Sequence, residues 1–257
     1  MKKLIVRKFG GACFQYLDGY RRVAHALSLS RDAQAVVVSA RKGMTDRLLG
    51  QVSELDGVGC TYADQLVATG ELQSAALLLV ALHAAGVPAE LVPADRVFET
   101  DGVAGGARVT AVRTDTVRAV LDRGAIPVVP GFYGAGASGR VVVFRRGGSD
   151  YSAVALGAAL GAAHVELCKA EVDGIFDKDP NVYPDARKFD TLSHGHALDI
   201  ARSGGKVLQV DSAELAMREG IVLCVKPAFD VGPGTWVGRG AQPVARARSH
   251  HDAAVAA

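Results

Sequence analysis

Two glycine pairs in this sequence stand beside charged residues where they could hold a phosphate group. Residues 8–11 read KFGG after a short apolar run, and residues 145–150 read RRGGSD before a strongly helical Ala/Leu run. A glycine pair at a strand end lets backbone N–H groups approach an anion, and a helix N-terminus adds a favourable dipole. Lys8 stands just before the first pair, where its ammonium could reach a phosphoryl group during transfer. The two segments therefore indicate phosphate binding and phosphoryl transfer.

Several other kinds of binding site find no support in the sequence. There is neither a GxxxxGK[ST] loop nor a GxGxxG motif followed by a ribose-binding acid, which argues against two large nucleotide-binding classes. The four cysteines form no CxxC pair, and the seven histidines do not stand at ligand spacing with them, so no zinc site can be read. A net charge of +2 is too balanced for a protein that binds nucleic acid or an anionic membrane. We expect no metal-ligating residues and neither of those partners.

The elements that must position these residues alternate between strand-like and helix-like segments. Short runs rich in β-branched residues are typical of strands buried on both faces. We expect strands at 4–9, 35–39, 91–92, 126–129, 141–144, 165–168 and 221–225. We expect helices at 16–29, 71–85, 114–123, 150–160, 194–202 and 212–218. This alternation predicts an α/β fold with a mostly parallel sheet between helices, and the Gly-rich segment 132–145 predicts an inserted β-hairpin.

The length of 257 residues suits one large domain. Periodicity is lost after Gly238, so we expect a domain over 1–238 and a flexible tail over 239–257. The first residues are not a signal peptide, and the longest apolar stretch, 74–82, falls far short of a membrane span. Scattered cysteines beside apolar neighbours fit a reducing cytoplasm.

Six motifs occur in the order found in one family of enzymes. They are KFGG at 8–11, VVSARKGMTDRL at 37–48, TGE at 69–71, PGF at 130–132, RGGSD at 146–150 and VDGIFDKDP at 172–180. In these motifs the chain resembles the aspartate kinases of the amino-acid kinase superfamily, from residue 3 to about Trp236. The resemblance implies a three-layer αβα sandwich, with the acceptor on the N-terminal side and ATP on the C-terminal side. It also implies Mg²⁺ as a cofactor and a cytoplasmic homo-oligomer, a dimer.

The resemblance also implies roles for individual residues. Lys8 and Asp150 would be catalytic, and Asp150 would also help to hold the amino acid. Glu71 and Arg146 are the natural pair for that amino acid, because its ammonium group needs a carboxylate and its carboxylate needs a guanidinium. The residues implied for the acceptor are Thr45, Glu71, Arg146, Gly147, Gly148 and Ser149. Those implied for the nucleotide are Gly10, Gly11, Ala170, Glu171, Phe176, Asp179, Lys206 and Val207.

The activity implied is ATP-dependent phosphorylation of the side-chain carboxylate of aspartate or a close analogue, giving an acyl phosphate and ADP. The chain departs from the family pattern at residues 12–13, where Ala-Cys replaces Thr-Ser, and at 170–171, where Ala-Glu replaces Thr-Asp. Two alternatives stay open. One is a kinase for another acceptor, a nucleotide monophosphate or a secondary metabolite, since VDGIFDKDP is also similar to uridylate kinases. The other is a non-catalytic binding or regulatory subunit. We expect a catalytic domain only, without the regulatory domains usual in the family.

Overall fold

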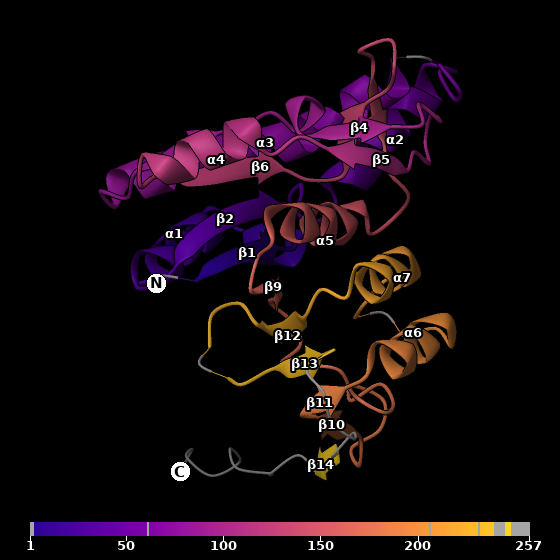
Figure 1. The fold of residues 1–257 in the computed structure, drawn as a ribbon. Helices are drawn as coiled ribbons and strands as arrows, with labels where there is room; N and C mark the ends of the chain where they lie inside the picture. Colours follow the sequence, from indigo (N-terminus) through magenta and orange to yellow (C-terminus); the bar gives the residue numbers. More distant parts are fainter. Residues whose placement is uncertain (1–2, 61, 206, 231, 239–244, 248–257) are drawn as a thin grey trace, which may run out of the picture.

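The computed structural model describes residues 3–60, 62–205, 207–230, 232–238 and 245–247. Within this part of the chain, one sheet has eight strands in the order β11-β13-β12-β9-β1-β2-β6-β3. Its pairings are parallel except that between β12 and β13. Figure 1 shows most of these strands in this order, from β6 near the top to β11 near the bottom. The strands are β1 (Leu4–Phe9), β2 (Ala33–Val38), β3 (Ala89–Leu91), β6 (Ile126–Pro130), β9 (His164–Lys169), β11 (Thr191–Leu192), β12 (Leu223–Pro227) and β13 (Thr235–Val237).

Helices cover both faces of this sheet, which confirms the predicted α/β sandwich. Successive strand residues point to opposite faces, and accordingly Val36 and Val38 pack in one apolar cluster with α1 and α3 while Val37 packs in the other with α5. Helices α6 and α7 continue the second layer beside α5 (Figure 1). The helices are α1 (Leu17–Ser28), α2 (Met44–Glu54), α3 (Ala63–Ala84), α4 (Asp115–Asp122), α5 (Gly148–Leu160), α6 (His194–Arg202) and α7 (Val210–Glu219).

The predicted hairpin belongs to a second, smaller sheet. Strands β7 (Tyr133–Ala135) and β8 (Val141–Val143) pair antiparallel, as expected for 132–145. In this sheet β7 also pairs with β4 (Phe98–Thr100), and β4 pairs with β5 (Val109–Val112). The sequence analysis did not identify β4 and β5 as strands. A third sheet pairs β10 (Arg187–Phe189) with β14 (Ala245–Ala247), so three residues of the expected tail form a strand. The rest of 239–257 lies outside the described residues.

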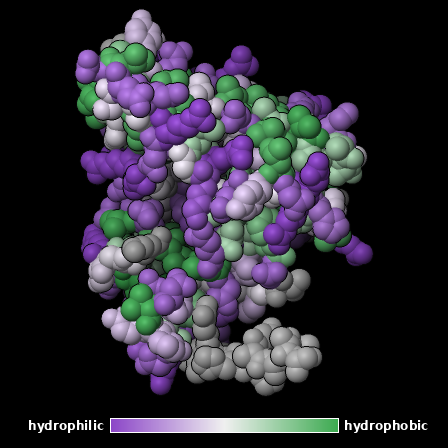
Figure 2. Space-filling view, turned by 180° about the vertical axis from the view of Figure 1, so that it is seen from behind, coloured by the Kyte–Doolittle hydropathy of each residue, from purple (hydrophilic) through white to green (hydrophobic). Residues whose placement is uncertain are grey.

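Helix α3 is longer than predicted and begins at Ala63, so Glu71 lies in its middle and not at its start. Its buried positions recur every three or four residues, as in a helix packed against a core on one side. In the described part of the chain it is the one helix long and apolar enough to cross a membrane, with a mean hydropathy of 1.5 over 18 residues. Asp64, Glu71 and Ser74 are buried on its inner face, however, which is the pattern of a core helix. Figure 2 shows hydrophilic residues spread over the whole height of one face of the molecule.

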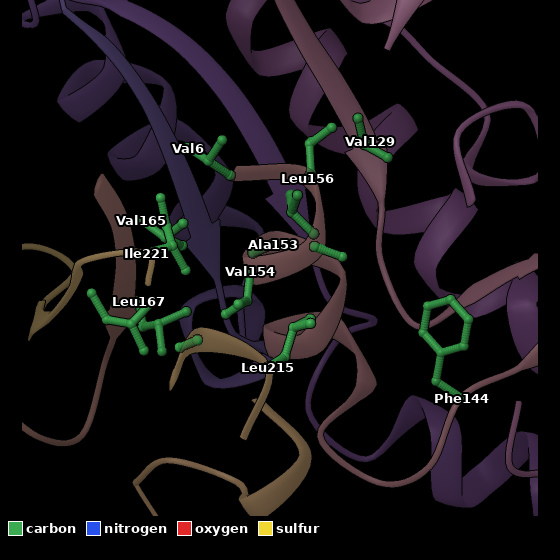
Figure 3. Packing of buried hydrophobic residues seen from close by; sticks show 14 of the residues in the cluster. Val6, Val129, Phe144, Ala153, Val154, Leu156, Val165, Leu167, Leu215 and Ile221 are labelled. Carbon is green, nitrogen blue, oxygen red and sulfur yellow. The ribbon is translucent and has the colours of Figure 1, made fainter. Parts of the chain in front are cut away.

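The position of α5 is fixed by apolar packing. Figure 3 shows Ala153, Val154 and Leu156 of this helix among the strand residues Val6 and Val165, all of them buried. Burying a valine or leucine side chain stabilises a fold by about 1.5–3 kcal/mol. This packing sets the first turn of α5, with Ser149 and Asp150, at the carboxyl ends of β1 and β9.

Candidate active site

The centre of the site is one buried carboxylate between two lysines. Asp150, in the first turn of α5, is 2% exposed. Its Oδ1 lies 2.7 Å from Nζ of Lys8, at the end of β1, and its Oδ2 lies 2.8 Å from Nζ of Lys169, the last residue of β9. The structure therefore brings together the two predicted catalytic residues and adds a lysine that the sequence analysis did not identify.

The electrostatics of this group follow from its burial. Burial alone would raise the pKa of Asp150, but the charges of Lys169 and Lys8 and their hydrogen bonds outweigh it and bring the pKa to about 2. Burial lowers the pKa of Lys8, as does the charge of Lys169, whereas Asp150 raises it. A carboxylate with a pKa this low stays ionised at neutral pH and does not accept a proton there.

The two glycines of the KFGG segment bring the backbone close to Lys8 and to the loop after β2. A Cβ atom at Gly11 would lie 2.6 Å from the carbonyl oxygen of Ala40, closer than real Cβ contacts come, so only glycine fits. The backbone N–H of Lys42 donates to the carbonyl oxygen of Gly11 (3.1 Å), which ties the loops after β1 and β2 together. Nζ of Lys8 lies beside Gly10, because a Cβ atom built on Gly10 would be 3.5 Å from it.

The buried carboxylate of Glu71 is only partly hydrogen-bonded. Its Oε1 accepts from the backbone N–H of Ala40 (3.2 Å), and its Oε2 is buried without a partner among the described residues. Asp64, two helical turns earlier on α3, has two hydrogen bonds, because its Oδ2 accepts from the N–H groups of Gly105 and Val143. Burial raises the pKa of Glu71 to about 7, although the Ala40 hydrogen bond and the charge of Lys8 lower it. Among the described residues, no lysine, arginine or histidine forms an ion pair with this side chain.

The other acceptor residues lie around the start of α2. Gly70, next to Glu71, packs against Met44 in the first turn of that helix, and Thr45 follows, half-buried. Arg146 reaches the same helix end, with its Nη2 3.2 Å from Oδ1 of Asp46. Both side chains of this ion pair are mainly exposed, which leaves the guanidinium accessible to a ligand.

The RGGSD segment turns the chain into α5. Gly147 is the N-cap with φ of +86°, a left-handed conformation that glycine adopts without strain, and it packs against Gln209. Gly148 and Ser149 are buried in the first turn. The hydroxyl of Ser149 lies against Gly131 of the predicted PGF motif, so the ends of β6 and α5 meet at this point.

A pocket of about 660 Å³ opens on the C-terminal side of the sheet. Its walls are the loop after β9, helix α6 and the segment after α6. Four predicted nucleotide residues line it, namely Glu171, Phe176, Asp179 and Val207. Lys169 lines it as well and so connects the pocket with Asp150. Its volume is in the range of small-ligand sites.

The remaining predicted nucleotide residues lie elsewhere. Ala170 is exposed and does not line the pocket, and Lys206 lies outside the described residues. Gly10 and Gly11 lie beside Lys8, at the junction between the two sides of the site. Glu171 forms an ion pair with Lys42 of the loop after β2, with 2.5 Å between Oε1 and Nζ. This exposed ion pair therefore joins the loop after β2 to the loop after β9 at the rim of the pocket.

Comparison with known proteins agrees with this arrangement. The sequence model of the amino acid kinase family matches residues 3–227. The chain belongs to the amino acid kinase family. The matched residues include Lys8, Asp150, Lys169 and the RGGSD segment.

Within this family the chain is similar to aspartokinases. It is 36% identical to the aspartokinase of Thermus thermophilus over 91% of this chain and 59% of that protein. The structure of the Synechocystis aspartate kinase matches with a TM-score of 0.81 and 33% identity, over 94% of this chain and 40% of that chain. E. coli aspartokinase III in complex with aspartate and ADP matches with a TM-score of 0.80 and 26% identity, over 91% and 64% of the two chains. The chain thus spans about 59% of the first of these relatives.

Three charged residues of the site were not predicted individually. Lys169 is the last residue of the buried strand β9, and Lys8 is the last but one of β1. Only the register between the two strands shows that both side chains lie on the same face of the sheet. Asp46 and Lys42 lie within the predicted VVSARKGMTDRL motif, and their partners Arg146 and Glu171 are 100 and 129 residues away in the sequence. Contacts at that separation require the fold.

Proposed function

We propose that this chain transfers the γ-phosphoryl group of ATP to the side-chain carboxylate of aspartate or a close analogue, giving an acyl phosphate and ADP. The observation that carries this proposal is Glu71, whose buried Oε2 has no partner among the described residues. An α-ammonium group would supply the missing donor and charge. Arg146, exposed at the same end of α2, can bind the α-carboxylate in a two-point contact.

The reaction needs positioning and charge stabilisation more than proton transfer. An oxygen of the acceptor carboxylate attacks the γ-phosphorus, and the bond from that phosphorus to the bridging oxygen breaks. The electron pair stays on the β-phosphate of ADP, and no proton moves. Lys8 stabilises the charge on the transferred group, and Asp150 fixes the position of Lys8. The low pKa of Asp150 suits this role, because no general base is required.

The pocket beside Lys169 is the proposed ATP site, since Phe176 and Val207 give it apolar walls. Mg²⁺ normally binds through one or two carboxylates together with substrate phosphates. The described residues contain no cluster of three or more His, Cys, Asp or Glu side chains, and both oxygens of Asp150 face lysines. These described residues do not form a site for the free ion, so we propose that Mg²⁺ would bind together with the phosphates of ATP.

The test is a coupled ADP-release assay with aspartate, glutamate, N-acetylaspartate, N-acetylglutamate and UMP as acceptors. We expect turnover with aspartate, trapping of the product by hydroxylamine, and a loss with N-acetylaspartate because that compound has no ammonium group for Glu71. ADP release with UMP alone would refute the proposal. Binding of ATP or aspartate without turnover of any acceptor would instead support the non-catalytic alternative.

We further propose a cytoplasmic homodimer. Cys13 and Cys168 are buried thiols, which suits a reducing compartment. Large apolar side chains are exposed near the connection of α2 and α3, where Leu55, Val58 and Tyr62 are each more than 70% exposed. A second copy of the chain would cover such side chains. Sedimentation equilibrium tests this, and a monomer at all concentrations would refute it.

A further inference from the structure

A second cavity, of about 590 Å³, lies on the face of the main sheet opposite α5. Its floor consists of side chains from β1, β9 and β12, and its walls are α1 and the loop after β12 (Figure 1). Arg7 of this floor and Lys8 are neighbours in β1, so their side chains point to opposite faces of the sheet. Because Lys8 contacts Asp150 of α5, the sheet itself separates this cavity from the candidate active site.

The floor of the cavity carries more positive than negative charge. Glu166 is buried, with its Oε2 2.8 Å from Nε of Arg7 and its Oε1 3.5 Å from Nζ of Lys226. Burial would raise the pKa of Glu166, but the hydrogen bond with His164 and the charges of Arg7 and Lys226 outweigh it and bring the pKa to about 2. One ionised carboxylate therefore faces two permanent cations at the floor.

The walls of the cavity increase this excess. Arg21 and Arg22, both exposed, line it from α1, and Asp230 lines it from the loop after β12. The guanidinium carbon of Arg22 lies 3.8 Å from the centre of the Phe229 ring, so an aromatic face and not a carboxylate holds it. Among the described lining residues, four lysine and arginine side chains stand against two carboxylates.

The rest of the lining is largely apolar. Phe9 and Cys168 contribute to the floor and Phe229 to one wall. A cavity of this volume with apolar walls and a few charged groups has the properties of a small-ligand site. The other apolar lining residues are Ala26, Leu29, Pro227 and Ala228.

We infer that this cavity binds a small organic anion, an apolar body that carries a carboxylate, at a site separate from the candidate active site. The guanidinium groups of α1 and the ammonium group of Lys226 bind the carboxylate, and the apolar body packs against Phe229 and Phe9. A cationic ligand would be repelled by the excess charge, and an uncharged ligand would leave that charge uncompensated. None of these side chains takes part in the proposed phosphoryl transfer.

The test measures the binding of three probes to the wild-type chain by ligand-observed NMR titration. 3-Phenylpropionate has an apolar body and a carboxylate, 3-phenyl-1-propanol has the same body without the charge, and propionate has the charge without the ring. We expect 3-phenylpropionate to bind at least about tenfold more tightly than either of the other two, a difference of about 1.4 kcal/mol. Saturating aspartate should not displace it, because the cavity and Asp150 lie on opposite faces of the sheet.

Two substitutions locate the probe in the cavity. Lys226→Met and Arg22→Met each remove one charge from the lining and keep an unbranched side chain. Each should weaken the binding of 3-phenylpropionate about 5- to 50-fold, as expected for the loss of a partly exposed charged contact. Arg96→Met is the matched control, because Arg96 is an exposed arginine that does not line the cavity, and it should bind the probe like the wild type.

Three results would refute the inference. They are no binding of 3-phenylpropionate to the wild type, equal binding of 3-phenyl-1-propanol, and wild-type affinity in both cavity variants. Displacement of the probe by aspartate, or equal weakening in Arg96→Met, would place the probe elsewhere and refute it as well. If Lys226→Met does not fold, Arg22→Met provides the same comparison, because Arg22 is exposed on α1.

Discussion

The buried carboxyl of Glu71 makes the stability of this protein depend on pH in a direction that can be worked out. Its pKa is about 7 in the folded chain, against an ordinary value of 4.5 that applies after unfolding. Between these values the folded protein holds a proton that the unfolded chain has released. The free energy of unfolding therefore decreases as pH rises from 4.5 to 7 and is constant, as far as Glu71 is concerned, above that range.

The size of this effect follows from the same two values. At about 1.36 kcal/mol for each pKa unit, a rise from 4.5 to about 7 corresponds to about 3 kcal/mol. Glu71→Gln removes the titration but keeps an oxygen to accept the N–H of Ala40, the bond that Glu71 makes at 3.2 Å. At pH 5 the variant should be more stable than the wild type by less than about 1 kcal/mol, because only part of the titration has occurred. At pH 8.5 the variant should be more stable than the wild type by about 3 kcal/mol.

Urea unfolding of both proteins at pH 5.0, 6.0, 7.0 and 8.5 measures this difference directly. Other titrating groups are common to both chains and cancel. Glu54→Gln is the control, because Glu54 is an exposed glutamate at the end of α2, and its effect on unfolding should not change with pH. The difference in unfolding free energy between the wild type and Glu71→Gln should change with pH. If it changes by less than about 0.5 kcal/mol from pH 5.0 to 8.5, the pKa of Glu71 is not raised by burial as stated above.

Three further substitutions test other parts of the site. Lys8→Met should fold and lose about 100- to 1000-fold in single-turnover rate, because it removes a positioned charge from the transferred group, and a loss below about tenfold would contradict that role. Arg146→Lys should weaken aspartate binding in calorimetry much more than ATP binding, since lysine cannot make the planar two-point contact, and equal weakening would place Arg146 outside the acceptor site. Lys42→Ala should lower the free energy of unfolding in urea by less than about 1 kcal/mol, because its pair with Glu171 is exposed, and a larger loss would mean that the pair stabilises the fold more than an exposed ion pair does.

Local patterns predicted much of the fold. The strand at 4–9 and the helix at 194–202 have the predicted bounds, since buried apolar runs and helical spacing with a capping serine, Ser193, are local signals. Helix α2 was not predicted, because its buried residues are only Leu48 and Val52 and its apolar stripe is short. The predicted start of α3 was too late, because a glycine such as Gly70 disfavours a helix interior. In the structure Gly70 packs closely on Ala40 and Met44, which requires a small residue within the helix.

Residues of the candidate site that lie within sequence motifs could be predicted. The contacts between residues far apart in the sequence could not. Glu71, Arg146 and Asp150 could be assigned from their motifs, but the unpartnered oxygen of Glu71 depends on how α3 packs beside Ala40. The position of Lys169 depends on the register of β9 with β1, which a single sequence does not encode in any local pattern. The missing information is thus long-range pairing.

The charges of the site, taken together, restrict the class of acceptor. Asp150 has a pKa of about 2 and both its oxygens face lysines, so it cannot take a proton from an acceptor at neutral pH. A hydroxyl acceptor would need a base other than Asp150, whereas a carboxylate or phosphate arrives ionised. Glu71 then separates these two, because the ionised form of this buried carboxyl repels a phosphate monoester and attracts an ammonium group, whose charge would in turn favour that form. An acceptor that carries both an ionised carboxylate and an ammonium group satisfies each of these side chains, and an amino acid with an acidic side chain is the simplest such molecule.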